Sequence, residues 1–441
     1  MNLGLFLLNF SAFTWKREKS NQVPVLAVGA SGFCDAGLIC LESLRSKGFR
    51  KAIANRWDPM LSHPFKLKAH LKICWLIAFS FQASSAINAS ENKSLELVPE
   101  AYRMAFTDQL KVAGDKSAVW MTAIEKAPQD HRAAVSFLVA NMPESDLKTL
   151  SSEFILKNVQ LAYDARYASP WAKSVPLELF FEQVLPYASV NEKRDDWRLD
   201  FMNRFLPMVR ELKSADEAVQ KLNIEVFKTL NVKYHATKRP KPDQSPYEST
   251  EAGFASCTGL SILLIDACRA VGIPARFVGT PSWTTVRGNH SWVEVFTDQW
   301  RFVGACEPSR LDETWFLDNA SKANESNPMN RIYATSYRKT GANFPLIWNR
   351  ELKSVPSEDV TRWYTTRRTL KISSGVESVG QTMEIRLDGR IVAQVQLKNS
   401  LKLDLAGGKT YKWILMDKQG MTQKQGDLVM PDMGLADLKL P

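Results

Sequence analysis

The feature that most constrains the fold is a short apolar segment that begins with a cysteine and has the spacing of a buried helix. Residues 257–272 read CTGLSILLIDACRAVG, and Leu260, Leu263 and Val271 fall on one face at helical intervals. Gly272, followed closely by a proline, ends the periodic pattern. The segment therefore predicts one compact helix with a stripe of side chains that face a core.

The pattern becomes mixed after this helix. Strands are expected at residues 275–278, 291–296 and 301–305, where short apolar runs are bounded by turn residues. Together with the helix, they predict an α+β core over residues 245–345.

The last two strands are expected to form a hairpin that turns at Asp298 and Gln299. If the turn has two residues, His290 lies directly opposite Glu307, with Cβ atoms roughly 4.5–5.5 Å apart. A carboxylate there could hold one imidazole nitrogen while the other nitrogen faces a thiol. Asp-Gln is not a favoured two-residue turn, and a slip of one residue would put the carboxylate on the other face of the sheet.

Cys257 is the candidate nucleophile. A free thiol titrates near about 8.5, and the N-terminus of a helix favours the thiolate that a nucleophile requires. The N–H groups of the same turn could form an oxyanion hole, and His290 near the sulfur would complete an ion pair. Downstream of residue 86 the chain holds three cysteines, Cys257, Cys268 and Cys306, without CxxC spacing. An odd count excludes a disulfide scaffold and indicates a reactive thiol.

Each of these residues also has an ordinary structural interpretation. A cysteine at a helix start is more often a small buried residue, and a histidine at a strand start is more often a surface or core residue. Glu307 can be a plain charge at a strand end, and Cys268 and Cys306 are expected to pack in the interior. A metal site built from Cys257, Cys306 and His290 would match no zinc spacing, so no metal is expected.

The joint order of these motifs resembles the transglutaminase-like superfamily, which includes transglutaminases, peptide N-glycanases and bacterial cysteine peptidases. The resemblance rests on CTGLSILLIDACRAVGIPARFVGT, NHSWVEVF and WRFVGACEP, beside the family's cysteine helix ending in GIPAR, its H-x-W-x-E-V strand and its W-x-x-x-D-P motif. It implies a papain-like core, with the cysteine helix packed on an antiparallel sheet and a triad of Cys257, His290 and Glu307. Two departures concern the acid: Glu replaces the usual Asp, and it follows Trp300 by seven residues instead of four.

Wider stretches of the chain, including LPYASVNEKRDDWR and SPYESTEAGFASC, resemble an uncharacterised group of bacterial exported proteins within this superfamily. The resemblance implies acyl transfer, in which the Cys257 thiolate attacks an amide carbonyl and water or an amine resolves the thioester. Hydrolysis of a protein or peptide substrate is expected over cross-linking, because an exported enzyme meets water everywhere. The alternative is a non-catalytic binding or scaffold protein of the cell envelope that retains the fold.

Aromatic side chains close to the motifs are candidates for the substrate cleft. Trp283 and Trp292 are the substrate-binding candidates, although a core position is at least as common for each. No acidic loop implies calcium, so no cofactor is expected.

The net charge of +10 does not indicate a nucleic-acid binder. Residues 1–86 hold 11 Lys and Arg and 4 Asp and Glu, whereas the remaining 355 residues hold 46 and 43. A nucleic-acid-binding protein is expected to keep its positive stripe in the folded part of the chain. We therefore expect no nucleic-acid partner.

Residues 60–86 are typical of a signal peptide. Lysines precede a short apolar stretch at 73–81, and small residues up to Ala86 offer a cleavage site. The apolar stretch is too short for a membrane span of about 20 residues. We expect export to the periplasm or the extracellular space, translation from Met60, and a mis-annotated or disordered extension at 1–59. The alternative is a longer N-terminal extension with a buried apolar helix.

Two further domains are expected around the core. Apolar residues at helical spacing predict a helical domain over residues 95–240, and a proline-rich loop at 235–249 leads into the core. Residues 365–441 predict a small β-sandwich, with a hairpin at Asp388 and Gly389 in MEIRL-DG-RIVAQVQL. This sandwich is a candidate contact for a cell-surface polymer.

Overall fold

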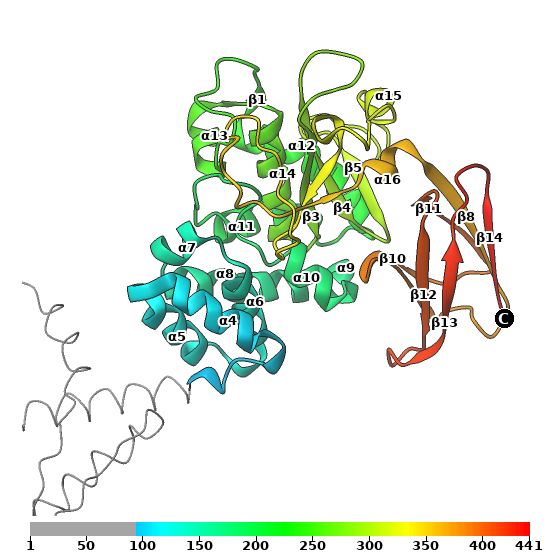
Figure 1. Cartoon of the computed structure of the whole chain (residues 1–441), viewed down its shortest axis with the longest axis horizontal. Helices are drawn as coiled ribbons and strands as arrows, with labels where there is room; N and C mark the ends of the chain where they lie inside the picture. The colour runs from blue at the N-terminus through cyan, green and yellow to red at the C-terminus, as the bar shows by residue number, and fades with distance from the viewer. Residues whose placement is uncertain (1–93) are drawn as a thin grey trace, which may run out of the picture. The chain divides into compact units, whose positions relative to one another are not determined.

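The computed structural model of the chain describes residues 94–441 (Figure 1). The predicted signal peptide at 60–86 and the segment 1–59 lie outside the described residues. None of the helices in residues 94–441 is long and apolar enough to cross a membrane.

The described chain begins with helices packed around large apolar side chains. Phe106, Trp120 and Leu138 are fully buried in this first core. Ser151 caps the longest of these helices by accepting a hydrogen bond from the N–H of Phe154. The helices are α4 (Glu100–Ala113), α5 (Ser117–Lys126), α6 (Arg132–Asn141), α7 (Glu144–Thr149), α8 (Ser152–Ala168), α9 (Pro170–Ser174) and α10 (Leu177–Gln183), with short 3-10 helices η2 (Gly114–Lys116) and η3 (Gln129–His131).

A second core surrounds the cysteine-initiated helix, which is confirmed as α14 (Cys257–Ala270). The helices α11 (Arg198–Val209) and α12 (Ala215–Leu230) pack against α14, and the buried cluster that contains all three begins at Val190. The boundary expected near residue 240 therefore separates α11 and α12 from the core to which they contribute. Amphipathic spacing predicts a helix and its buried face but does not identify the partner of that face.

An antiparallel sheet of five strands lies beside α14, in the order β5-β4-β3-β6-β7. Helix α14 packs on β3 and β4, so the arrangement implied by the family resemblance is confirmed. The strands are β3 (Ala275–Thr280), β4 (His290–Phe296), β5 (Trp300–Val303), β6 (Tyr333–Thr335) and β7 (Ser357–Asp359). The other elements of this part are β1 (Lys233–Tyr234), α13 (Pro246–Ala252), β2 (Phe254–Ala255), α15 (Leu317–Ala320), η4 (Pro328–Asn330) and α16 (Thr361–Thr365).

The predicted register of the β4–β5 hairpin is wrong by one residue. Phe296 pairs with Trp300, so the turn has three residues instead of two. The last of these, Gln299, is held in a bridge to Ala393 of the C-terminal domain, a contact between residues distant in sequence. Strand β5 also ends at Val303, so the ladder does not extend as far as Glu307.

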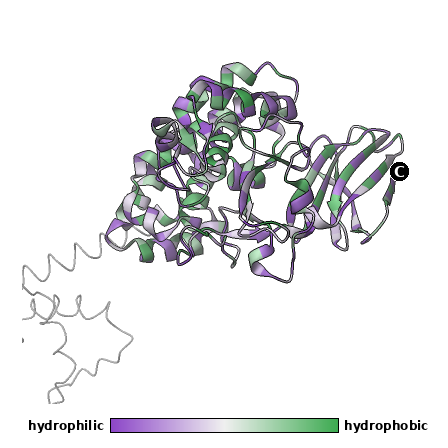
Figure 2. Cartoon of the chain, turned by 90° about the horizontal axis from the view of Figure 1, so that it is seen from above, coloured by the Kyte–Doolittle hydropathy of each residue, from purple (hydrophilic) through white to green (hydrophobic). Residues whose placement is uncertain are grey.

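The C-terminal residues form two facing sheets in a sandwich-like arrangement, as predicted. Their orders are β10-β9-β12-β13 and β11-β8-β14, and buried side chains from both sheets make one core cluster. Figure 2 shows hydrophobic and hydrophilic residues alternating along these strands. The strands are β8 (Arg367–Ser374), β9 (Thr382–Leu387), β10 (Arg390–Gln396), β11 (Ser400–Ala406), β12 (Thr410–Met416), β13 (Thr422–Val429) and β14 (Ala436–Leu440).

The predicted hairpin between β9 and β10 is confirmed. Leu387 pairs with Arg390 across a two-residue turn. Asp388 and Gly389 both have positive φ, 50° and 80°, as a tight turn with the twist of the flanking strands requires.

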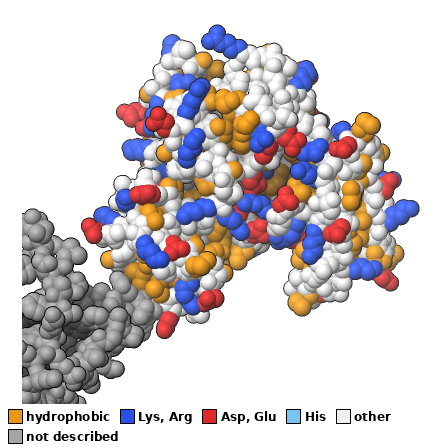
Figure 3. Space-filling model, viewed as in Figure 1, with side chains coloured by type: hydrophobic (Ala, Val, Ile, Leu, Met, Phe, Trp, Pro, Cys, Tyr) orange, Lys and Arg blue, Asp and Glu red, His pale blue; other side chains and the backbone are white. Residues whose placement is uncertain are grey.

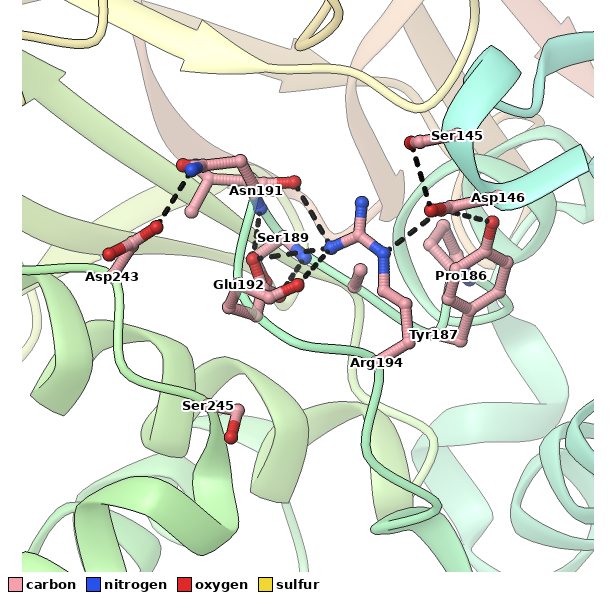
Figure 4. Close-up of polar contacts among 12 residues, drawn as sticks. Ser145, Asp146, Pro186, Tyr187, Ser189, Asn191, Glu192, Arg194, Asp243 and Ser245 are labelled. Atoms are coloured by element: carbon pink, nitrogen blue, oxygen red, sulfur yellow. Dashed lines mark hydrogen bonds and ion pairs between the residues drawn. The ribbon is translucent and has the colours of Figure 1, made fainter. Parts of the chain in front are cut away.

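A cluster of hydrogen bonds connects helix α7 to the loop between α10 and α11 (Figure 4). The Asp146 carboxylate on α7 accepts hydrogen bonds from Arg194 Nε at 2.9 Å and from the Tyr187 hydroxyl at 2.8 Å. In the same loop, the Glu192 carboxylate accepts from the N–H groups of Ser189 and Val190 at 2.6 and 2.8 Å. These bonds fix the loop that leads from α10 into α11.

Charged side chains of both signs are interspersed over the face shown in Figure 3.

Candidate active site

Cys257 is the first residue of α14 and is half-buried. The preceding Ser256 does not cap the helix, because its hydroxyl donates to the carbonyl of Pro242 at 3.2 Å. In contrast, Ser245 and Glu248 form a complete capping box on the neighbouring helix α13. The first turn of α14 thus keeps N–H groups without a side-chain cap, at the positive end of the helix dipole.

The thiol of Cys257 contacts the start of β4. Burial raises its pKa, while hydrogen bonds from the backbone and side chains of Ser291 and Thr258 oppose this change without cancelling it. The hydroxyls of Ser291 and Thr258 are also 3.3 Å apart. Near neutral pH the resting cysteine is therefore a thiol, held against the residue that directly follows His290.

His290 is the first residue of β4 and is buried, with 8% of its surface exposed. Its ring stacks on Trp292 at 5.8 Å and lies 4.9 Å from Phe316 and 5.0 Å from Trp315, measured between ring centroids. Burial among these rings lowers the pKa of His290 to about 4. The imidazole is therefore neutral near pH 7 and able to accept a proton.

The Nε2 atom of His290 is buried and has no hydrogen-bond partner within residues 94–441. Leaving a buried polar atom without a hydrogen bond costs about 1–3 kcal/mol of folding free energy. Such an atom in a folded protein therefore indicates that another group forms the hydrogen bond during function. A reacting thiol, a substrate amine or a water molecule would satisfy this nitrogen.

Glu307 does not hold the imidazole as expected. Its carboxylate accepts a hydrogen bond from Trp315 Nε1 at 2.9 Å, and no hydrogen bond joins it to His290 in the described chain. Burial raises the pKa of Glu307, while the Trp315 N–H acts in the opposite direction. Glu307 therefore reaches His290 only through the indole of Trp315.

The loop that carries Glu307 is firmly anchored. Asn223 of α12 donates to the carbonyls of Gly304 and Glu307 at 2.9 and 3.0 Å, and it accepts from the N–H of Cys306 at 2.9 Å. A Cβ atom at Gly304 would lie 2.0 Å from Glu307 Oε2, so only glycine leaves room for this carboxylate. Contacts from α12 thus fix the backbone segment that carries Glu307.

The two tryptophans expected to meet substrate are largely interior. Trp292 is fully buried and donates from Nε1 to the Tyr364 hydroxyl at 2.8 Å, so it has no exposed surface for the substrate contact expected of it. Trp283 is 7% exposed and stacks on Trp292 with an interplanar angle of 5°. Both rings instead pack near His290: Trp292 shares its face of β4, and the Trp283 ring centroid lies 6.1 Å from that of the imidazole.

Trp315 is the site residue that the sequence motifs did not reveal. It is 62% exposed, although it contacts both His290 and Glu307. It lies in a loop without periodicity, and the only sequence signal was a tryptophan a few residues after the proposed acid.

The other cysteines take structural positions. Cys268 is fully buried in α14, as predicted, and Cys306 is half-buried against the same core cluster. Within residues 94–441, no cluster of three or more His, Cys, Asp or Glu side chains could hold a metal ion.

The comparisons agree with the geometry of the cysteine helix. Residues 206–305 match the family model described as the transglutaminase-like superfamily. This chain carries a transglutaminase-like domain. The match includes Cys257 and His290 and ends two residues before Glu307. A match to this superfamily supports a cysteine-dependent enzyme.

A solved structure shows a partial likeness to this chain. It is a proposed cysteine protease from Cytophaga hutchinsonii, with 17% sequence identity and a TM-score of 0.25. The likeness covers 32% of this chain and 45% of that chain, so this chain spans less than half of the neighbour's length. No curated protein matches the sequence.

Proposed function

We propose that this protein is an exported cysteine-dependent acyl-transfer enzyme that hydrolyses an amide or peptide bond through a thioester on Cys257. The observation that carries the proposal is the position of the thiol. It lies at a helix N-terminus without a side-chain cap, against Ser291, and His290 directly precedes that serine. A buried cysteine with a purely structural role requires neither the uncapped turn nor a neutral imidazole one residue from the serine that it contacts.

The site residues can carry out acylation and deacylation with His290 acting in turn as base and acid. His290 accepts the thiol proton as the Cys257 sulfur attacks the amide carbonyl. The first-turn N–H groups of α14 stabilise the oxyanion of the tetrahedral intermediate. His290 then gives the proton to the departing amine, which leaves a thioester. Water attacks the thioester as His290 accepts one of its protons, and His290 then returns this proton to the departing Cys257 sulfur. The carboxylic acid product leaves and ionises by releasing its proton to the solvent.

Glu307 and Trp315 have a positioning role in this proposal. The carboxylate holds the indole by its N–H, and the indole lies against the imidazole. This relay orients His290 by packing, whereas the acid of a papain-like triad orients the histidine by a direct hydrogen bond.

Hydrolysis and transamidation can be separated by the fate of the thioester. We expect peptides incubated with the protein in ¹⁸O-labelled water to gain one labelled oxygen at each new carboxyl terminus, and the Cys257→Ala variant to yield no product. Incorporation of an added primary amine in place of labelled oxygen would identify a cross-linking enzyme instead.

A second candidate function is a binding or scaffold protein that retains the fold. The observation that favours it is the missing hydrogen bond between Glu307 and His290, since the directly bonded triad is incomplete in this conformation. It requires that Cys257→Ala leave the biological activity of the protein intact. The C-terminal sandwich would then be the candidate contact for a cell-surface polymer, which cosedimentation with isolated cell envelopes would test.

Export is part of the proposal and has its own test. N-terminal sequencing of the exported protein is expected to start at residue 87. A mature product that retains residues before Met60 would contradict both the cleavage and the proposed start.

A further inference from the structure

A loop beside the nucleophile carries positive charge that the proposed chemistry does not use. We call residues 233–241 (KYHATKRPK) the basic loop. Strand β1 at its start pairs in parallel with β2, so Tyr234 lies next to Ala255. Beyond its end, the carbonyl of Pro242 accepts the hydroxyl of Ser256. Tyr234 near the start of the basic loop and Pro242 just after its end thus contact Ala255 and Ser256, the two residues that directly precede Cys257.

Three of the four cationic side chains of the basic loop have no acidic partner among the described residues. The loop contains three lysines and one arginine and no carboxylate. Lys241 pairs with Glu248 at 2.9 Å. Within the described residues, Lys233, Lys238 and Arg239 form no ion pair.

The loop is held in place by local contacts. The Nδ1 atom of His235 accepts the N–H groups of Thr237 and Lys238 at 3.1 and 3.0 Å. The Lys238 ammonium lies 5.7 Å from the ring centroid of Phe254, three residues before Cys257. Arg239 is half-buried, and its Nε has no hydrogen-bond partner within residues 94–441. The loop thus presents cationic groups, one of them with an unsatisfied donor, beside the segment that leads directly into Cys257.

We propose that the basic loop selects acidic peptides, so that the amide cleaved by Cys257 is flanked by carboxylate side chains. This inference rests on the proposed function and specifies its substrate class. Charges of one sign close to a reactive group raise the local concentration of the opposite sign, and the effect weakens as salt screens it. A peptide carboxylate would also satisfy the guanidinium of Arg239.

Alkylation of Cys257 tests the local charge without a substrate. Iodoacetate is an anion and iodoacetamide is neutral, and in both reactions the thiolate displaces iodide and forms a carbon–sulfur bond. The ratio of the two rates at one pH cancels the thiolate fraction and reports the potential at the sulfur. The rates are measured at Cys257 by peptide mass spectrometry, at low and at high salt.

The test variant is the double substitution Lys233→Glu and Lys238→Glu, since both side chains are exposed. We expect it to lower the ratio of iodoacetate to iodoacetamide rates by about three- to tenfold at low salt, and by much less at high salt. The matched control is Lys418→Glu with Lys424→Glu, which changes the net charge equally at exposed positions of the C-terminal sandwich. It should leave the ratio unchanged.

A milder variant and a substrate pair complete the test. Lys233→Gln with Lys238→Gln should shift the logarithm of the ratio by about half as much. The wild type should cleave a peptide with glutamates flanking the scissile bond with a kcat/KM several-fold above that of the matched glutamine peptide.

Each outcome separates this inference from the proposed function. A ratio equal in wild type and in both Lys233/Lys238 variants overturns the acidic-peptide proposal, even if Cys257 reacts and peptides are cleaved. Cleavage with equal preference for the two peptides overturns it as well. If neither reagent modifies Cys257, the proposed function fails, and this inference fails with it.

Discussion

The indole of Trp315 lies between the proposed acid and the proposed base, and this arrangement predicts how Glu307 variants behave. In Glu307→Gln, the amide oxygen can still accept the Trp315 N–H, so the ring should stay against His290. We expect kcat/KM to fall by less than tenfold, whereas loss of the carboxylate from a directly bonded triad costs about 10⁴-fold. Glu307→Ala, which removes the acceptor, should lose more activity than Glu307→Gln. A 10³-fold loss in Glu307→Gln would show that the acid bonds His290 directly during catalysis.

Trp315 itself allows a graded test. Trp315→Phe keeps a ring beside His290 but removes the N–H that lowers the pKa of Glu307, so that pKa should rise further. Trp315→Ala removes both contacts. A loose histidine loses catalytic geometry, so we expect about a tenfold or greater fall in kcat/KM for Trp315→Ala and a smaller fall for Trp315→Phe. Equal activity of all three proteins would remove Trp315 from the site.

Local signals are sufficient to predict the elements that carry the candidate residues, α14 for Cys257 and β4 for His290. Cys257 at a helix start and His290 at a strand start follow from hydrophobic spacing and from family motifs within short segments. Glu307 could not be placed, because its position depends on the end of β5 and on contacts of Asn223, more than eighty residues away. The interior position of Trp292 depends on Tyr364 of α16, a contact that the local sequence pattern does not predict.

At the scale of the elements, the buried guanidinium of Arg198 joins α11 to its surroundings. It donates to Asn158 of α8 at 2.8 Å and to the carbonyls of Val184, Leu185 and Pro186. Removing a buried charged partner leaves these acceptors unsatisfied.

We therefore expect Arg198→Met to lower the free energy of unfolding by about 3–5 kcal/mol, measured by urea denaturation. The matched control on the same helix is Arg204→Met, which removes an exposed pair with Asp200 worth about 0–1 kcal/mol. Similar losses in the two variants would contradict the structural role of Arg198.

An element could be predicted from the sequence where the turn residues themselves favour one backbone conformation. Asp388-Gly389 specified its hairpin, because only a few residues tolerate two positive φ angles in sequence. The β4–β5 turn was misassigned because Gln299 pairs with β10, and a contact of this kind leaves no trace in the local sequence. The packing of α11 and α12 against α14 likewise depends on contacts between residues distant in sequence.

At the scale of the whole described chain, Gln299 connects the catalytic sheet to both sheets of the C-terminal sandwich. Its backbone bridges to Ala393 of β10, and its Oε1 accepts from the N–H of Asp404 in β11 at 2.9 Å. Ion pairs from Arg367 to Asp312 at 2.9 Å and to Asp404 at 2.8 Å reinforce the contact. The sandwich is thus attached to the hairpin whose first strand begins with His290.

Gln299→Ala tests this attachment. The side chain is 2% exposed, so its loss should leave the N–H of Asp404 unsatisfied and lower the free energy of unfolding by about 1–3 kcal/mol. Limited proteolysis between the core and the sandwich should become faster. Gln425→Ala, at an exposed position of β13, is the control and should change neither quantity. Unchanged proteolysis in Gln299→Ala would show that the sandwich is held by other contacts.

In the proposed mechanism Cys257 is acylated with His290 as the proton acceptor, and this mechanism predicts a characteristic pH dependence of acylation. We would measure acetylation by p-nitrophenyl acetate, with the modified cysteine identified by peptide mass spectrometry, in wild type and in His290→Ala. The neutral imidazole is the reactive form, so the wild-type rate should fall as the pH drops through about 4 and stay level from there to neutral pH.

Without the base, only free thiolate reacts. Because the pKa of Cys257 is raised, the rate in His290→Ala should climb about tenfold per pH unit through the neutral range. At pH 7 it should be about 10²–10⁴ times slower than the wild type. Identical pH profiles in the two proteins would show that His290 is not the base. Acetylation of Cys306 instead of Cys257 would show that Cys257 is not the nucleophile.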